Sequence, residues 1–321
     1  MPISAPIYTV DGLVASVLNK YIVPISQNTV TTQNIVDLLD EEMRSTIVPV
    51  INSVHEEYWV HLNDVTIIQN VNNYDIPQRC VAGMLRDVVF VDNNGNELNV
   101  SQLSPVQIKS GFPYGPPLPV YGFGYYMQDD QVVLFPPQRS AALAFKLRLK
   151  FFRRPNNLTL TTNCGQIVSI NGNILTLSYV SPDWSTSTTF DIIQNNPQFR
   201  SMSDDTQITN VSGNMITLSM SAADVVTNGI ATGMWVCPAT TTCIPQIPYE
   251  AFPLLVQRGI MRVAESYMEV AAVQAAEKRY IEMKDNLVKM IEPRVQGGTK
   301  TVINPDSKVR FRGFWGSPGL R

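Results

Sequence analysis

Residues 166–178 read QIVSINGNILTLS, and residues 207–219, 41 positions later, read QITNVSGNMITLS. In both copies, apolar residues alternate on either side of a Gly-Asn dipeptide, which predicts two strands joined by a tight turn. Gly172 and Gly213 occupy the turn position that requires a positive φ. Two copies are too few for a solenoid or a propeller. We therefore expect a compact inserted all-β domain, a sandwich or a small barrel, at residues 159–246.

Residues 1–158 precede this domain and begin with helices. Thr9 can cap a short helix whose apolar residues lie on one face. Thr32 can cap a longer one, in which apolar residues recur at helical spacing as far as Val54. Pro49 falls within this second run. We therefore expect either a kink or two abutting helices with Pro49 in the first turn of the second.

Strands are expected from Tyr58 onward, where the period of the apolar residues changes to two. The predicted strands are residues 65–68, 85–91, 97–100, 121–127, 131–135 and 144–153, with turns at 92–95 and 128–130. The last strand alternates apolar with basic residues, so one of its faces should be buried. Residues 111–119 are rich in Pro and Gly and predict a loop.

Helical spacing returns in residues 249–292, and the apolar stripe slips at residues 271–274. The slip indicates either the turn of an αα-hairpin or a register shift in one long helix. We assign residues 247–296 to the same core as residues 1–158. The predicted fold class is therefore α+β: a helical bundle with antiparallel β hairpins, an inserted all-β domain and an extended C-terminal arm.

The C-terminal arm, residues 297–321, differs from the rest of the chain in charge and composition. It holds five basic residues and one acidic residue, a net charge of +4, which leaves −7 on the remainder of a chain whose net charge is −3. The arm is too short and too rich in Gly and Pro to bury its own aromatic residues. Because Arg and aromatic side chains anchor protein interfaces, we expect a partner protein to bind the arm. An acidic body is unlike a nucleic-acid binder.

No residues with the spacing of a catalytic or metal site stand out. Cys80, Cys164, Cys237 and Cys243 have neither disulfide nor metal-ligand spacing, and we expect four buried free thiols. His55 and His61 are six residues apart and would lie on different helical faces, which argues against a shared metal. We expect no enzyme, no cofactor and no metal. The sequence also lacks a secretory leader and a run of eighteen apolar residues, so we expect neither secretion nor membrane insertion.

The order of these parts resembles the head-to-tail connector, or adaptor, proteins of tailed bacteriophages. The resemblance is carried by VTTQNIVDLLDEEMRSTIVPVINSVHEEYWV (30–60), NNYDIPQRCVAGMLRDVVF (72–90), YYMQDDQVVLFPP (125–137), LAFKLRLKFFRRPNNL (143–158), AAEKRYIEMKDNLVKMIEPR (275–294) and NPDSKVRFRGFW (304–315). These motifs are loose, and the inserted β-domain is the part that the pattern least requires.

The resemblance implies a structural virion protein. Members of this family form a ring, expected to be a dodecamer, between the portal protein and a downstream tail or nozzle protein, and DNA passes through the lumen. The ring would lie in the neck of the virion and assemble in the host cytoplasm. The family binds the portal through its C-terminal arm. On this sequence that function maps onto Lys308, Arg310, Phe311, Arg312, Phe314 and Trp315.

Two other functions remain open on the sequence. The Asn- and Thr-rich β-domain could be a carbohydrate-binding or tail-fibre module that presents exposed aromatic residues such as Trp184 and Trp235. Asp183 and Asp191 could form the carboxylate pair of a glycan hydrolase, although carboxylates beside Gly, Ser and Thr are more often turn formers and helix caps.

Overall fold

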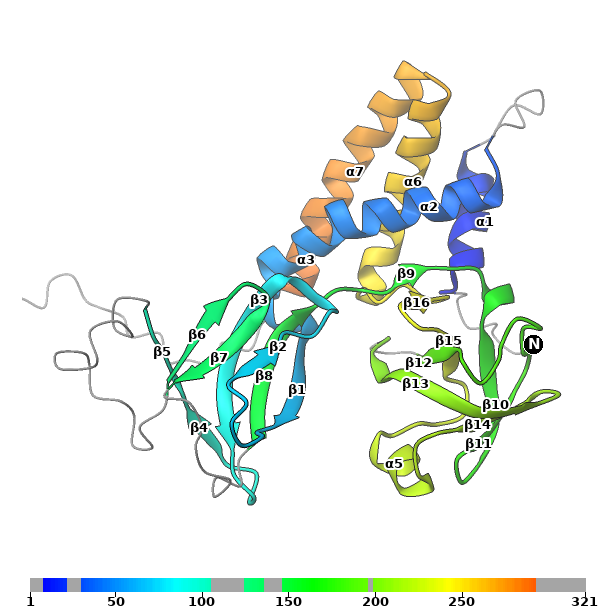
Figure 1. Ribbon diagram of the computed structural model, residues 1–321. Helices are drawn as coiled ribbons and strands as arrows, with labels where there is room; N and C mark the ends of the chain where they lie inside the picture. The colour runs from blue at the N-terminus through cyan, green and yellow to red at the C-terminus, as the bar shows by residue number, and fades with distance from the viewer. Residues whose placement is uncertain (1–7, 22–29, 105–123, 136–145, 196–198, 293–321) are drawn as a thin grey trace, which may run out of the picture.

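The computed structural model describes residues 8–21, 30–104, 124–135, 146–195 and 199–292 (Figure 1). The fold is α+β, as predicted. A helical bundle lies at the top of Figure 1, and two β-bodies lie side by side below it. One body is a pair of four-stranded sheets, and the other is a closed six-stranded barrel. The inserted β-domain is therefore the small barrel and not the sandwich.

The bundle is built from residues on both sides of the β-bodies. Its helices are α1 (Val10–Lys20), α2 (Thr32–Glu42), α3 (Val48–Val54), α6 (Phe252–Ser266) and α7 (Val270–Ile291). Thr9 caps α1 as predicted, because its hydroxyl accepts a hydrogen bond from the Gly12 N–H at 3.3 Å. The predicted cap of α2 is wrong by one residue. Thr31, whose backbone is extended, accepts the bond from the Asn34 N–H, and Thr32 is already helical.

Pro49 lies where two helices abut. A π-helical segment, Met43–Ile47, separates α2 from α3, and Pro49 occupies the first turn of α3. Proline has no N–H and clashes with the carbonyl four residues earlier in a regular α-helix. The wider π turn before it is consistent with this constraint. The second of the two predicted arrangements is therefore confirmed.

The C-terminal helical stretch forms a hairpin. A 3₁₀ turn, Tyr249–Ala251, leads into α6, and α7 returns antiparallel to it (Figure 1). The break lies at residues 267–269, a few positions before the predicted slip, and Met268 has a left-handed φ of 57°. No glycine supplies this conformation. The Met268 side chain is exposed, so it meets no packing constraint there.

The first sheet has the order β1-β8-β3-β4 and is antiparallel throughout. Its strands are β1 (Val60–Thr66), β3 (Cys80–Val91), β4 (Glu97–Asn99) and β8 (Lys146–Arg153). The first strand starts five residues earlier than predicted and ends at Thr66. In β8 every second residue is buried, as predicted, from Leu147 to Arg153.

The second sheet has the order β2-β7-β6-β5. Its strands are β2 (Asn73–Asp75), β5 (Ser101–Gln102), β6 (Gly124–Gln128) and β7 (Gln131–Phe135). The predicted hairpin is confirmed from residue 124 onward, while residues 121–123 and the predicted loop 111–119 lie outside the described residues. The two sheets share one apolar core, which includes Phe90, Leu134 and Leu149.

The barrel closes in the order β10-β11-β14-β13-β12-β15. Its strands are β10 (Gly165–Asn171), β11 (Ile174–Leu177), β12 (Thr189–Ile193), β13 (Ser201–Ser212), β14 (Met215–Leu218) and β15 (Trp235–Pro238). The two copies of the repeat form the hairpins β10–β11 and β13–β14, which pair through β11 and β14. Gly172 and Gly213 have φ of 61° and 58°, as predicted. A short helix, α5 (Ala222–Thr227), packs Val225 into the barrel core.

The C-terminal arm lies outside the described residues, and with it the predicted docking residues Lys308, Arg310, Phe311, Arg312, Phe314 and Trp315. Among the helices that the structure describes, none is both long and apolar enough to cross a membrane.

Candidate functional site

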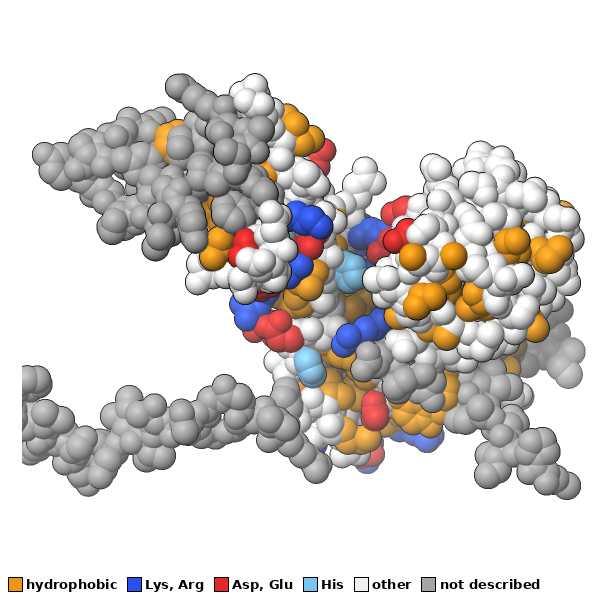
Figure 2. Space-filling model, turned by 90° about the horizontal axis from the view of Figure 1, so that it is seen from below, with side chains coloured by type: hydrophobic (Ala, Val, Ile, Leu, Met, Phe, Trp, Pro, Cys, Tyr) orange, Lys and Arg blue, Asp and Glu red, His pale blue; other side chains and the backbone are white. Residues whose placement is uncertain are grey.

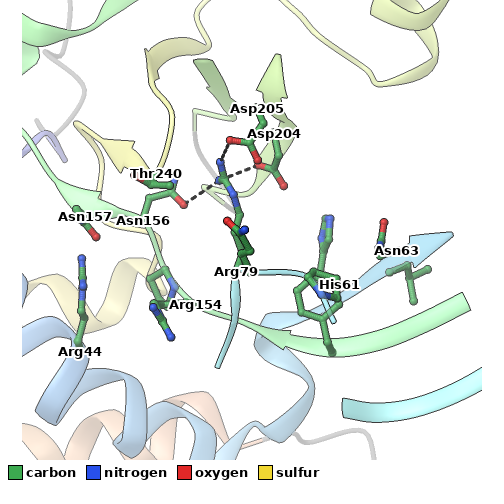
Figure 3. Close-up of a pocket in the computed structure, with 15 residues that line it drawn as sticks. Arg44, His61, Asn63, Arg79, Arg154, Asn156, Asn157, Asp204, Asp205 and Thr240 are labelled. Carbon is green, nitrogen blue, oxygen red and sulfur yellow. Dashed lines mark hydrogen bonds and ion pairs between the residues drawn. The ribbon is translucent and has the colours of Figure 1, made fainter. Parts of the chain in front are cut away.

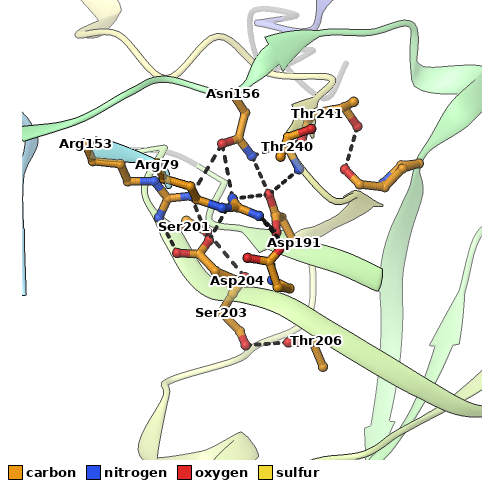
Figure 4. Close-up of polar contacts among 12 residues, drawn as sticks. Arg79, Arg153, Asn156, Asp191, Ser201, Ser203, Asp204, Thr206, Thr240 and Thr241 are labelled. Atoms are coloured by element: carbon orange, nitrogen blue, oxygen red, sulfur yellow. Dashed lines mark hydrogen bonds and ion pairs between the residues drawn. The ribbon is translucent and has the colours of Figure 1, made fainter. Parts of the chain in front are cut away.

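The barrel and the first sheet meet at a cluster of charged side chains. Arg79, in the turn before β3, and Arg153, the last residue of β8, come from the sheet. Asp191 in β12 and the neighbours Asp204 and Asp205 in β13 come from the barrel. Figure 4 shows both guanidinium groups pointing at the barrel carboxylates. We call these five residues the junction cluster.

Asp191 is the centre of the junction cluster, and it is 0% exposed. The guanidinium of Arg79 binds its carboxylate in bidentate fashion, with N···O distances of 2.6 and 2.9 Å. The same carboxylate accepts hydrogen bonds from the backbone N–H groups of Asp205 at 3.0 Å and Thr240 at 2.9 Å. Burial lowers the pKa of Arg79, but its bonds to Asp191 and the nearby Asp204 and Asp205 outweigh this and raise it. The Arg79 guanidinium is therefore held in its charged form.

Asp204 makes the second link between the two bodies. Arg153 binds it in bidentate fashion, with both N···O distances 2.7 Å. Burial raises the pKa of Asp204, but the charge of Arg153 and the hydrogen bonds from Ser201 and Arg153 lower it below its usual value. Arg79 also contacts Asp204, at 3.3 Å. The two arginines thus share one set of barrel carboxylates.

The two covalent connections between the bodies run through the same place. Residues 154–157 lead from β8 into the barrel, and residues 245–248 lead from the barrel to the bundle. Asn156, which is buried, donates from its side chain to Asp191 at 2.6 Å and from its backbone to the Gln246 side chain at 2.8 Å. The short strands β9 (Asn157–Leu158) and β16 (Thr241–Thr242) pair in parallel beside them. These bonds and the junction cluster fix the orientation of the barrel relative to the sheet.

A cavity of about 610 Å³ lies beside the junction cluster. Figure 2 shows the hollow between the two β-bodies, with charged and histidine side chains along it, and Figure 3 shows its lining. His61 on β1 faces the cavity together with Arg79, Asp204 and Asp205. Burial and the charge of Arg153 lower the pKa of His61. The imidazole is therefore neutral at pH 7, and the carboxylates are engaged by arginine.

A second buried carboxylate lies in the helical bundle. Glu42, the last residue of α2, is 0% exposed and binds two arginines that are four residues apart on α6. The Arg258 Nε lies 2.6 Å from one carboxylate oxygen, and the Arg262 Nε donates to the other. Burial raises the pKa of Glu42, but the hydrogen bonds from Arg258, Thr46 and Arg262 outweigh it and lower the pKa.

Helix α7 leaves two large apolar side chains uncovered on one of its faces. Of its 22 residues only Ala276 and Leu287 are buried. Val270 and Ile281 are 66% and 53% exposed. Ala276 and Leu287 are eleven residues apart, and so are Val270 and Ile281. Eleven residues are about three helical turns, so the two buried residues share one face of the helix and the two exposed residues share another. The face with Ala276 and Leu287 packs in the bundle, and the face with Val270 and Ile281 carries apolar side chains into solvent.

The structure corrects the carbohydrate-binding prediction in one respect. Trp184 was expected to be exposed, but it is buried against Phe190 with ring centroids 4.5 Å apart. Trp235 is partly buried and packs against the bundle core. Trp184 and Phe190 fill the barrel interior, as the core of a small barrel requires.

The two carboxylates that could form a hydrolase pair, Asp183 and Asp191, lie in different environments. Asp183 is exposed in a loop, while Asp191 is fully buried and bound to Arg79. Asp191 could reach a substrate only if the junction cluster opened. The pair therefore lacks the open cleft between two carboxylates that glycosidases use.

The sequence did not single out Arg79 or Arg153 as members of a site. A signal for Arg153 was present in the sequence. The alternation of β8 places Arg153 on the same face as Leu147, Leu149 and Phe151, and an arginine on an apolar face requires a carboxylate partner. The four cysteines are buried and free, as predicted. No protein-family model matches the chain, and a search of curated proteins returns no match.

Proposed function

We propose that the protein is a structural subunit of a ring-shaped adaptor between the portal and the tail of a bacteriophage. The ring provides the channel through which the genome passes, and the protein resides in the neck of the virion. Its partners are further copies of itself, the portal protein and a downstream tail or nozzle protein. The sequence resemblance suggests a dodecamer.

The uncovered face of α7 is the observation that carries this proposal. Val270 and Ile281 lie on one face of a 22-residue helix that forms the outer member of the α6–α7 hairpin (Figure 1). On this face Gln274 and Glu277 lie between the two apolar side chains, and a mixture of exposed apolar and polar residues is typical of a non-obligate protein interface. In a closed ring each subunit presents a surface to the next, so this face would be covered by a neighbouring copy.

The junction cluster supports the same function in another way. A ring subunit must present its domains at the same angle in every copy, because small differences between copies prevent closure. Arg79 and Arg153 make six hydrogen bonds to the barrel carboxylates, and Asn156 joins Asp191 to the connecting segment at residues 154–157. The acidic body is also suited to a channel, since a basic lumen would retain DNA through its phosphates.

The first experiment tests portal binding. The purified full chain and a variant that ends at Gln296 are each mixed with the candidate portal ring, and bound copies are counted by native mass spectrometry. We expect the full chain to bind in a fixed number of copies, twelve on the family pattern, and the shortened chain not to bind. Binding by both would assign the interface to the helical bundle. Binding by neither would contradict the proposal.

The second experiment tests the α7 face directly. Ile281→Glu places a charge on the face that we expect to be buried between copies. Arg279→Glu, at an exposed polar position on another face of the same helix, is the matched control. Both variants should unfold at the temperature of the native protein, because neither position is buried in the subunit. Only Ile281→Glu should reduce the number of copies on the portal. Equal binding by both variants would exclude α7 from the interface.

A further inference from the structure

Three of the four cysteines lie together at the base of the barrel. Cys164 immediately precedes β10, Cys237 lies in β15, and Cys243 follows β16. Their Sγ atoms all lie within 4.8 Å of one another, and those of Cys237 and Cys243 are 3.9 Å apart. All three side chains are buried. No local sequence pattern predicts this cluster, because the three residues come from separate elements.

The spacing of the sulfur atoms fits a metal site. With metal–sulfur bonds of about 2.3 Å, the sulfur atoms around one ion lie roughly 3.8–4.0 Å apart. Cys237 and Cys243 already have this separation, and Cys164 can reach it by a shift of at most about 1 Å. A disulfide between Cys237 and Cys243 would shorten their separation to about 2 Å and leave Cys164 unused. We propose that Cys164, Cys237 and Cys243 bind one thiophilic d¹⁰ metal ion, such as Zn²⁺ or Cd²⁺, as three thiolates.

The proton balance of binding follows from the donor set. Cysteine binds a metal ion as the thiolate, so each thiol that still carries a proton loses it to solvent on binding. A divalent ion and three thiolates together carry a net charge of −1.

The donor set decides the class of metal. Sulfur ligands select soft ions such as Zn²⁺ and Cu⁺ and discriminate against Mg²⁺ and Ca²⁺. Within the described residues no His, Asp or Glu completes the group of three. Structural zinc sites normally have four protein ligands, so a three-thiolate site should prefer a softer ion. We therefore expect Cd²⁺ to bind at least as tightly as Zn²⁺.

The bound ion would connect the barrel to the bundle. Cys164 immediately precedes the first strand of the barrel, Cys237 lies in the last strand, and Cys243 lies in the segment that returns to α6. The Cys243 carbonyl accepts a hydrogen bond from the Val10 N–H at the start of α1, at 2.8 Å. Because the cluster is buried, the ion should be taken up while the chain folds and released slowly from the folded protein.

The test uses the full chain, unfolded in denaturant with a chelator and then refolded with or without Cd²⁺ under reducing conditions. We expect one equivalent of Cd²⁺ after gel filtration, and the ultraviolet charge-transfer absorption of cadmium thiolates. Cys164→Ser and Cys243→Ser should each lose this absorption. Cys80→Ser removes a buried thiol of the sheet core and is the matched control, which should keep it. Zn²⁺ in place of Cd²⁺ should protect the native protein against unfolding.

If a serine variant does not fold, the native protein is used to test the metal site. Its reactive thiols are counted in denaturant with chelator, before and after the metal is bound. Four thiols together with one bound Cd²⁺ support the proposal. Four thiols and no bound metal would show that the cluster is apolar packing, and two thiols would show a disulfide. Cadmium that is retained by all cluster variants would place it elsewhere. Each of these last three results would overturn the proposal.

Discussion

Two carboxylates in this protein are fully buried and bound by arginine, yet their surroundings differ. Glu42 joins α2 to α6, and these helices also share an apolar core. Asp191 joins the barrel to the first sheet, whose apolar cores have no residue in common among the described residues. At the first position, charge adds to a contact that apolar packing already makes. At the second, the charged side chains of the junction cluster and the two connecting segments, residues 154–157 and 245–248, make the contact.

The exposure of the arginines sharpens this comparison. The side chains of Arg258 and Arg262 are 18% and 34% exposed, while that of Arg79 is 14% exposed. Arginine side chains that reach water can solvate their charge when a partner is lost. Arg79 has less access to water and lies among further polar groups that depend on Asp191. A buried charge without a partner costs more than an exposed one. The two carboxylates should therefore respond differently to the same substitution.

The largest effect is expected for Asp191→Asn. The amide removes the one fully buried charge partner of Arg79 and leaves it Asp204 and the exposed Asp205. The new NH₂ group can also face the N–H donors of Asp205 and Thr240. We expect the free energy of unfolding to fall by about 3–5 kcal/mol, measured by urea denaturation. The hinge at residues 154–157 should also become sensitive to protease. Asp183→Asn, at an exposed position of the same domain, is the control and should change stability by less than about 0.5 kcal/mol.

Glu42→Gln should cost less, about 1.5–3 kcal/mol, because charge-assisted hydrogen bonds are lost but both arginines can turn toward water. The Thr46 hydroxyl that donates to Glu42 can instead accept from the new amide. The measurement is again urea denaturation. Glu41→Gln is the matched control on the exposed side of α2. If Glu42→Gln cost as much as Asp191→Asn, solvent access of the arginines would not explain the difference.

Low pH should destabilise both the Glu42 contact in the bundle and the junction cluster. The pKa values of Glu42 and Asp204 are lowered from their ordinary values of 4.5 and 3.8. A lowered pKa in the folded state contributes stability above the unfolded pKa, and this stability is lost as pH falls through the folded value. We therefore expect the free energy of unfolding to decline below about pH 4.5. In Glu42→Gln this decline should be shallower, and an unchanged slope would contradict the role of Glu42.

The sequence predicted the elements better than the contacts between them. The repeat placed the turns at Gly172 and Gly213, and Pro49 predicted the junction of α2 and α3, because each depends on local backbone chemistry. The spacing of Arg258 and Arg262 also shows that both lie on one face of α6. Nothing local, however, connects Arg79 to Asp191, which is 112 positions away, or brings Cys164 beside Cys237. The first pair depends on how the barrel is seated on the sheet, and the second depends on the pairing of β10 with β15 that closes the barrel.

The smallest effect is expected where the same chemistry lies at the surface. Glu97 on β4 contacts Arg148 at 3.1 Å and Lys150 at 2.6 Å across the solvent face of the first sheet. Surface ion pairs contribute up to about 1 kcal/mol, because water already solvates both partners. Glu97→Gln should therefore reduce the free energy of unfolding by less than about 1 kcal/mol at low ionic strength.

Salt separates this surface pair from the two buried carboxylates. At an ionic strength of about 1 M the Debye length falls to roughly 3 Å. Urea denaturation should then give the same stability for Glu97→Gln and the native protein. Asp191→Asn should keep most of its deficit under the same conditions, since no mobile ion can approach a carboxylate that is 0% exposed. Equal salt sensitivity in the two variants would mean that the junction cluster opens to solvent, and that it does not hold the barrel in one orientation.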